Sequence, residues 1–396
     1  ATDRDITTAQ DKLRKNLDDD GARLQLANAF LQKARELADP TLYTRAETLL
    51  ATLADRQPND KRVLVARAVL GLARHQFKDA LTLADRAVAA APGDVSALGV
   101  QVDALTELGR VDEALSATQK MLDAKPNLAS YTRASYAQEQ RGDLAAAAAS
   151  MQQAVIAGQG GPEENRAFAQ VQLGTLLLTT GAIADAEAAY AAALATFPGY
   201  APAQAGQARA LVARGRPAEA VDILARVVAA QPLAEYAILL GDALAGAGRQ
   251  AEAARAYERV DAIQALYTAN GVNVDLELAL FAADHRPGKA ALAKAKKGFA
   301  THPSLFGHDV VAWNLYKVGD LDKAATESAA ALRIGSRDPS QQYHAAVIAA
   351  ARGDRPAAVG HLQSVLDTNP RFSAALAPDV ERLAADLGLA VPPPPA

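Results

Sequence analysis

The middle of the chain has hydrophobic, small and proline positions in an order that predicts two paired helices. The segment LGTLLLTTGAIADAEAAYAAALATFP contains small residues at Gly174, Gly181 and Ala186, an aromatic residue at Tyr190 and a proline at Pro198. Small residues let two antiparallel helices approach closely, while Leu and Tyr at helical spacing cover the next pair. A proline ends the second helix because it cannot continue the hydrogen-bond ladder. The segment therefore predicts a helix-turn-helix unit.

This unit recurs along the chain with a period of 34 residues. The interval separates Gly181 from Gly215, Ala186 from Ala220, and Pro198 from Pro232, and it also links Pro58, Pro92 and Pro126. We expect about ten units, with second helices centred near Ala46, Ala80, Ala114, Ala147, Ala186, Ala220, Ala253, Ala290, Ala324 and Ala358. Repeats of this length imply one supersecondary unit per period, stacked so that each unit contacts mainly its neighbours.

The period and the order Leu-Gly, Gly, Ala, Tyr, Ala, Pro resemble the tetratricopeptide repeat family, over about residues 21–375. The resemblance is to bacterial multi-repeat members of unassigned role. It implies an all-α fold, a right-handed superhelical solenoid of about ten helix-turn-helix repeats with an extended concave surface. A stack of this kind is expected to behave as one cooperative body rather than several domains.

Three segments and the two ends depart from the repeat. The insertion KARELADPTLYTRAE lengthens the first hairpin, residues 158–167 form a glycine-rich loop, and residues 261–286 lack the proline stop and contain an overlong helix ending at Asn270-Gly271. Residues 1–20 predict an N-terminal capping helix, and residues 376–396 a C-terminal capping helix followed by the tail VPPPPA. A proline tail cannot form a helix, so an extended or disordered end is expected.

Composition excludes several classes of function. There are 41 Lys and Arg against 45 Asp and Glu, a net charge of -4, so no overall positive field attracts nucleic acid. No Cys is present, which excludes disulfides and thiolate metal sites. No apolar run reaches the roughly 20 residues needed to cross a bilayer. The start ATDRD, without Met, is what signal cleavage behind a small residue would leave, and it favours a periplasmic or secreted protein, although Met removal or trimming would look the same.

Catalytic and cofactor motifs are missing. The sequence has no HExxH, P-loop or GxSxG pattern, so we expect no enzymatic activity and no cofactor. Five of six histidines, His285, His302, His308, His344 and His361, lie in the last third, but their spacing favours exposed or capping imidazoles over a metal site. The basic stretch Lys289, Lys294, Lys296 and Lys297 is explained as a solvated helix face, with an acidic partner or lipid headgroups as the alternative.

The resemblance also implies where a partner would bind. In this family the first helix of each repeat lines the concave groove, so the residues just after the small position face inward. The candidate groove residues that the resemblance implies are Asp103, Glu107, Tyr136, Glu139, Arg209, Asp242, Asp309, Trp313, Tyr316, Lys317 and Tyr343. Trp313 is the only tryptophan, and large aromatic residues contribute strongly to binding. The sequence supports equally well that Trp313 packs in the interface between two repeats.

Two functional hypotheses follow. The first is a non-catalytic scaffold that binds a partner protein or peptide in the groove, a hypothesis that rests largely on fold analogy. The second is a structural subunit of a larger or filamentous extracellular or periplasmic assembly, because the end faces of a solenoid suit contacts between copies.

Overall fold

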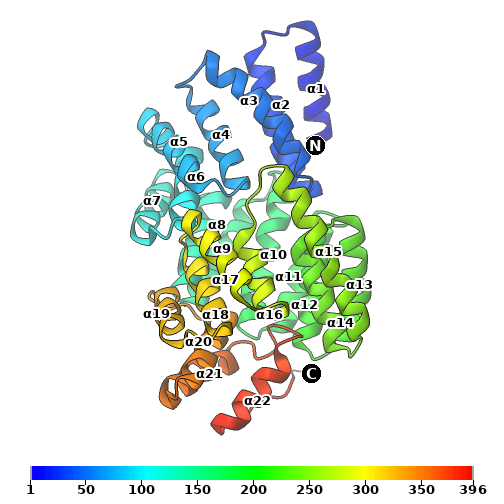
Figure 1. The fold of residues 1–396 in the computed structure, drawn as a ribbon. Coiled ribbons are helices and arrows are strands. Elements are labelled where there is room, and N and C mark those ends of the chain that lie inside the picture. The colour runs from blue at the N-terminus through cyan, green and yellow to red at the C-terminus, as the bar shows by residue number, and fades with distance from the viewer. Residues whose placement is uncertain (1, 395–396) are drawn as a thin grey trace. The chain divides into compact units, whose positions relative to one another are not determined.

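The chain is helical throughout the part that a computed structural model describes, residues 2–394. Those residues form 22 helices and no strand, and 78% of the chain is helical. The predicted all-α repeat fold is confirmed, because the helices from α2 to α21 form ten consecutive pairs (Figure 1). No helix within the described residues is both long and apolar enough to cross a membrane. Of the predicted C-terminal tail, Pro395 and Ala396 lie outside the described residues, as does Ala1 of the predicted N-terminal cap.

The helices divide between two compact units. Unit 1 consists of Ala1–Arg133 and Gln264–Val274, and unit 2 of Ala134–Ile263 and Asp275–Ala396. The first eight helices are α1 (Thr2–Lys15), α2 (Asp20–Leu37), α3 (Thr41–Arg56), α4 (Lys61–Ala73), α5 (Phe77–Ala90), α6 (Val95–Glu107), α7 (Val111–Ala124) and α8 (Leu128–Gln140), which ends in unit 2. The predicted boundaries at residues 20 and 375, and the predicted single cooperative body, stay predictions.

Unit 2 contains the remaining helices, except for the end of α15. They are α9 (Leu144–Ala157), α10 (Glu163–Thr179), α11 (Ile183–Thr196), α12 (Ala201–Ala213), α13 (Pro217–Ala230), α14 (Ala234–Gly246), α15 (Gln250–Ala269), α16 (Asp275–His285), α17 (Lys289–Thr301), α18 (Leu305–Lys317), α19 (Leu321–Ala331), α20 (Pro339–Ala351), α21 (Arg355–Asp367) and α22 (Ala377–Leu387).

Close helix approach in the repeats depends on the small residues that the sequence pattern singles out. A Cβ added at Gly174 in α10 would lie 2.6 Å from Cε1 of Tyr190 in α11. The same tyrosine ring also covers Gly206 of α12, where a Cβ would lie 2.3 Å away. Tyr190 is fully buried as a result. One aromatic ring therefore fills both the gap within a repeat and the gap to the next one.

The second helices end where the prolines predict. α7 ends at Ala124 and α13 at Ala230, two residues before Pro126 and Pro232 respectively. The overlong helix without a proline is α15, which has 20 residues and ends at Ala269, directly before the Asn-Gly turn. Because the repeat is irregular here, one predicted centre is wrong: Ala290 is exposed, and the neighbouring Ala291 is the first buried residue of α17.

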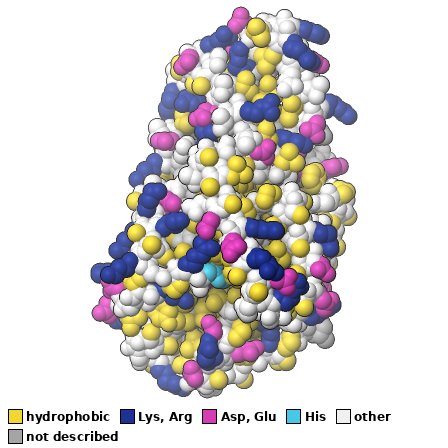
Figure 2. Space-filling model, turned by 45° about the vertical axis from the view of Figure 1, so that its right-hand side comes forward, with side chains coloured by type: hydrophobic (Ala, Val, Ile, Leu, Met, Phe, Trp, Pro, Cys, Tyr) yellow, Lys and Arg dark blue, Asp and Glu magenta, His cyan; other side chains and the backbone are white. Residues whose placement is uncertain are grey.

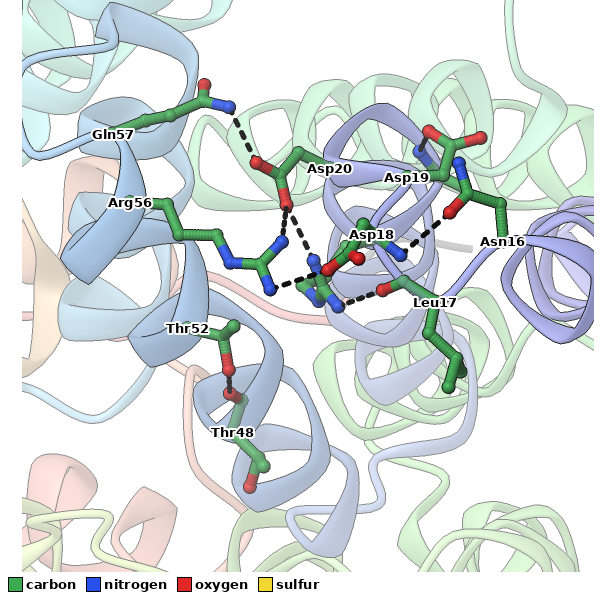
Figure 3. A network of polar contacts seen from close by, with 11 residues as sticks. Asn16, Leu17, Asp18, Asp19, Asp20, Thr48, Thr52, Arg56 and Gln57 are labelled. Carbon is green, nitrogen blue, oxygen red and sulfur yellow. Dashed lines mark hydrogen bonds and ion pairs between the residues drawn. The ribbon is translucent and has the colours of Figure 1, made fainter.

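The connection between α1 and α2 is fixed to the end of α3 by a polar network (Figure 3). Arg56 donates to Asp18 at 2.8 Å and to Asp20 at 3.1 Å, and Gln57 Nε2 donates to the other carboxylate oxygen of Asp20 at 2.9 Å. The side chain of Asp19 caps α2 by accepting from a backbone N–H of its first turn. The N-terminal helix is thereby joined to the first repeat by side chains as well as by packing.

A segment distant in sequence completes unit 1. The Tyr267 hydroxyl donates to the carbonyl of Ala38 at 3.1 Å, and the backbone N–H of Asn273 donates to the carbonyl of Arg74 at 3.2 Å. Both carbonyls lie in turns between the two helices of a repeat. Between these bonds Val272 is buried. Residues 264–274 therefore pack along the turns of the first two repeats.

Candidate functional site

Six of the eleven predicted groove residues lie on three first helices of unit 2. Asp242 comes from α14, Asp309, Trp313, Tyr316 and Lys317 from α18, and Tyr343 from α20. In α14, an added Cβ at Gly241 would lie 2.1 Å from the Tyr257 ring of α15, and the next residue, Asp242, accepts a hydrogen bond from the hydroxyl of that tyrosine. We call these residues and their direct neighbours the inner cluster.

Trp313 lies at the centre of the inner cluster. Its ring stacks on Tyr316 with centroids 4.9 Å apart and on His344 with centroids 4.2 Å apart. Its Nε1 donates to Asp284 of α16 at 2.7 Å, and the Lys317 ammonium lies 4.3 Å from its ring centroid. Only 2% of the residue is exposed. The tryptophan therefore organises the packing of α16, α18 and α20, and direct contact between Trp313 and a partner stays a prediction.

Asp309 and His344 form a buried pair beside this stack. Nδ1 of His344 lies 3.0 Å from the Asp309 carboxylate, and both side chains are almost inaccessible. Burial disfavours the imidazolium, but the nearby carboxylates, above all Asp309, outweigh it and hold the pKa of His344 above its usual value. The expectation of exposed or capping histidines is wrong for His344, whereas His302, which is also buried, is the C-cap residue of α17. A position on the inner side of a first helix explains the burial of His344.

Asp242 anchors the more accessible part of the inner cluster. It accepts a hydrogen bond from the Tyr257 hydroxyl at 2.8 Å, and Nε2 of His285 lies 3.6 Å away. Burial raises the pKa of Asp242 to about 7, against the lowering effect of the tyrosine hydrogen bond. Burial also lowers the pKa of His285 and of Lys317. Burial therefore makes the charged form of each of these groups less favourable than it is at the surface.

The other five predicted residues lie outside the inner cluster. In unit 1, Asp103 of α6 is bound by two guanidinium nitrogens of Arg133, at 2.8 and 2.5 Å, and Glu107 is half-buried at the end of the same helix. In unit 2, Tyr136 of α8 is 46% exposed, Glu139 follows one turn later, and Arg209 is half-buried on α12. Their role in binding stays a prediction, and the sequence-based list does not describe one continuous site.

Several functional neighbours were missed from the sequence. Arg133 fixes Asp103, and Asp284, His285 and Tyr257 complete the inner cluster. A signal existed for Tyr257, because it follows Gly241 at the same interval at which Tyr190 follows Gly174. No comparable signal existed for the others, since the irregular segment 261–286 obscures the register of α16.

Charged side chains elsewhere are mostly solvated. Lys289, Lys296 and Lys297 of the basic stretch are exposed on α17, where Lys297 pairs with Asp275 at 2.9 Å. On the face drawn in Figure 2, basic and acidic side chains lie interspersed among hydrophobic ones. Within residues 2–394 no group of three or more His, Asp or Glu side chains is placed to hold a metal ion.

Comparisons with known proteins identify the repeat. Tetratricopeptide repeat profiles match residues 31–95, 71–129, 100–162 and 177–243, together half of the chain. No curated protein sequence matches at a significant level. Solved structures similar to the chain include a tetratricopeptide repeat protein from Parabacteroides merdae, at 15% identity over 62% of this chain and 98% of that one, with a TM-score of 0.44. They also include a thermophilic TPR protein from Thermus thermophilus, at 23% identity over 47% of this chain and 99% of that one, with a TM-score of 0.41.

Proposed function

Because the chain belongs to the tetratricopeptide repeat family, whose repeats bind other proteins and are in general non-catalytic, we propose that it is a non-catalytic scaffold. The partner is a protein or peptide segment, and it lies along the inner side of the first helices of unit 2. We also propose that the protein is located outside the cytoplasm, in the periplasm or secreted. Fractionation of the source cells tests this location.

One observation carries the proposal. The half-exposed side chains of Tyr316 and Lys317 lie on one helix face, and Asp242 and His285 join them from neighbouring repeats. Tyrosine side chains contribute disproportionately to protein binding, and polar groups typically form the rim around such contacts. The buried pair Asp309–His344 and the stacked Trp313 hold these helices in register beneath that face. The inner cluster is therefore a preorganised surface rather than a flexible one.

The test places a photo-crosslinking amino acid at inner and outer positions and identifies captured chains in the source cells by mass spectrometry. Tyr136 of α8 and Lys317 of α18 are the inner positions, and Ile156 of α9 is the control, since it is 48% exposed on the second helix of the same repeat as Tyr136. We expect one partner to be captured at Tyr136 and Lys317 and not at Ile156. Capture at Ile156 alone would contradict the proposed face.

Self-assembly is the second candidate, and exposed leucines near the N-terminal end favour it. Leu17 is 74% exposed and Leu37 is 48% exposed. Apolar side chains exposed at the end of a repeat array favour contacts between copies. Light scattering of the purified protein, compared with Leu17→Ser, distinguishes the candidates: large particles that disappear in the variant support assembly, and monomers at all concentrations contradict it.

A further inference from the structure

The connection between α21 and α22, residues 368–376, reaches back to earlier repeats of unit 2 (Figure 1). A Cβ added at Gly181, in the turn of the fifth repeat, would lie 3.2 Å from the carbonyl oxygen of Thr368. A Cβ added at Gly246, the last residue of α14, would lie 3.1 Å from Cβ of Ala374 and 3.3 Å from its carbonyl oxygen. The connection therefore touches the fifth and the seventh repeats as well as the helices that it joins.

The length of this connection exceeds what a link between two helices needs. Regular repeats are joined by short connections, such as residues 197–200 and 231–233. The connection 368–376 is more than twice as long, and Thr368 and Asn369 at its start are buried. The additional length allows it to cross to the other repeats.

The same connection lies on the inner cluster. The Phe372 ring lies 5.9 Å from the Tyr343 ring of α20, measured between centroids, and it packs against the apolar core of which Tyr343 is part. Gly246 follows Asp242 by one turn of α14, so Ala374 meets the helix face on which this inner-cluster residue lies. An aromatic ring and a methyl group of the connection thus occupy part of the face on which we place the partner.

No hydrogen bond or ion pair holds the connection to the earlier repeats. Among the described residues, every hydrogen bond of residues 368–376 is made within residues 364–394. Arg371, for example, donates from its guanidinium to the carbonyl of Pro392 at 3.0 Å, and from its backbone to the side chain of Asn369 at 3.0 Å. The two glycines that the connection touches have no side chain to interlock with it. The connection can therefore leave the inner face without breaking a hydrogen bond.

We propose that Phe372 and Ala374 are internal occupants of the inner face, and that the partner binds there by displacing them. The partner's segment is then recognised by the same chemistry: an aromatic ring against Tyr343 and, two residues later, a small side chain against Gly246. The connection keeps this part of the face covered until a segment with that pattern competes for it. The inference rests on the proposed function, because it names the chemistry and the regulation of the same face.

A synthetic peptide tests whether the connection occupies an exchangeable site. The probe is a fluorescein-labelled peptide with the sequence of residues 368–377, TNPRFSAALA. The receptor is the variant Phe372→Ser/Ala374→Glu, which loses both contacts of its own connection and keeps the face itself unchanged. By fluorescence polarisation, we expect the peptide to bind this variant at least about tenfold more tightly than the parent, whose own connection competes at a high effective concentration. A helical circular dichroism signal equal to that of the parent shows that the variant folds.

Two controls locate the bound peptide. A peptide that carries the same two substitutions is expected not to bind. Adding Gly246→Leu to the receptor fills the place of Ala374 and is expected to abolish binding, whereas adding Gly360→Leu, at a helical glycine with no atom within 4 Å of an added Cβ, is not. Absence of binding to the receptor, equal binding to the parent, or binding that Gly246→Leu leaves unchanged overturns the proposal.

An engineered disulfide separates this inference from the proposed function. Gly246→Cys/Ala374→Cys has its two Cβ positions 3.1 Å apart, close to the about 3.5–4.5 Å of a disulfide, and the chain has no other Cys. With the photo-crosslinking amino acid at Lys317, we expect the oxidised protein to capture at least about tenfold less partner than the reduced one. Equal capture in both forms would overturn displacement and leave the scaffold in place. No capture in either form, with peptide exchange intact, would contradict the scaffold and not the internal occupant.

Discussion

Asp242→Asn tests whether the inner cluster holds a carboxylate at a cost to stability. Burial raises the pKa of this carboxyl from its ordinary 3.8 to about 7, and its side chain is only 17% exposed. Each pKa unit corresponds to about 1.4 kcal/mol, so ionised Asp242 costs the native state about 4 kcal/mol. Because the native pKa is raised, the native state is favoured by protonation below about pH 4, and that advantage is lost as the pH rises to about 7.

Asparagine keeps the shape of the side chain and cannot ionise. We therefore expect Asp242→Asn to raise the free energy of unfolding above that of the parent at both pH values, and to raise it by about 3 kcal/mol more at about pH 8.5 than at about pH 5. Comparing the variant with the parent at each pH cancels the titration of all other groups that the substitution leaves undisturbed. The Tyr257 hydroxyl can still donate to the amide oxygen, so the hydrogen bond that it makes to Asp242 in the parent is kept.

Urea unfolding followed by tryptophan fluorescence is the assay. The sole tryptophan is Trp313, which lies in the inner cluster, so the signal reports unfolding of this part of unit 2. Asp322→Asn is the control, because that carboxylate is 91% exposed in the same unit. Equal pH dependence of the parent and Asp242→Asn would refute the reasoning, and a gain of similar size in the control would show that the effect does not depend on burial.

Three further experiments test packing, pairing and the distant segment. Gly241→Ala is expected to destabilise unit 2 by about 2 kcal/mol or more, because the added Cβ would overlap the facing Tyr257 ring. The control is Gly360→Ala, at a helical glycine with no atom within 4 Å of an added Cβ, and it is expected to stabilise the unit by about 0.5–1 kcal/mol. Thermal unfolding compares the two variants. A double-mutant cycle between Asp103 and Arg133 is expected to give a coupling of about 1 kcal/mol that falls with added salt, and zero coupling would contradict the bidentate pair. Tyr267→Phe removes a hydrogen bond worth about 1 kcal/mol, and faster amide exchange at residues 34–39 is the expected readout.

Much of the fold could be predicted from sequence because the repeat encodes it locally. The interval between Gly174 and Tyr190, and the proline after most second helices, determine contacts between residues fewer than 34 positions apart. Such contacts recur in every regular repeat. The helix pairs and their ends therefore followed from the pattern, and the register slipped by one residue at Ala290, after the irregular segment.

The candidate site could be predicted only in part. The repeat register indicates that Asp242 and Trp313 both follow the small residue of a first helix. It does not indicate which side chains pack against them. The stacking of Trp313 on His344, and the contact of Gly142 with Gly335, depend on how repeats far apart in sequence meet. That depends on small rotations between successive repeats, which add up along the array and are not visible in any single one.

The segment 264–274 that completes unit 1 has a consequence for synthesis of the chain. A ribosome releases the first seven helices long before it makes Tyr267 and Asn273. Until then the turn carbonyls of Ala38 and Arg74 lack these two donors, so the first two repeats emerge as an unfinished structure. The N-terminal third of this protein reaches its final form only after about two thirds of the chain has been translated.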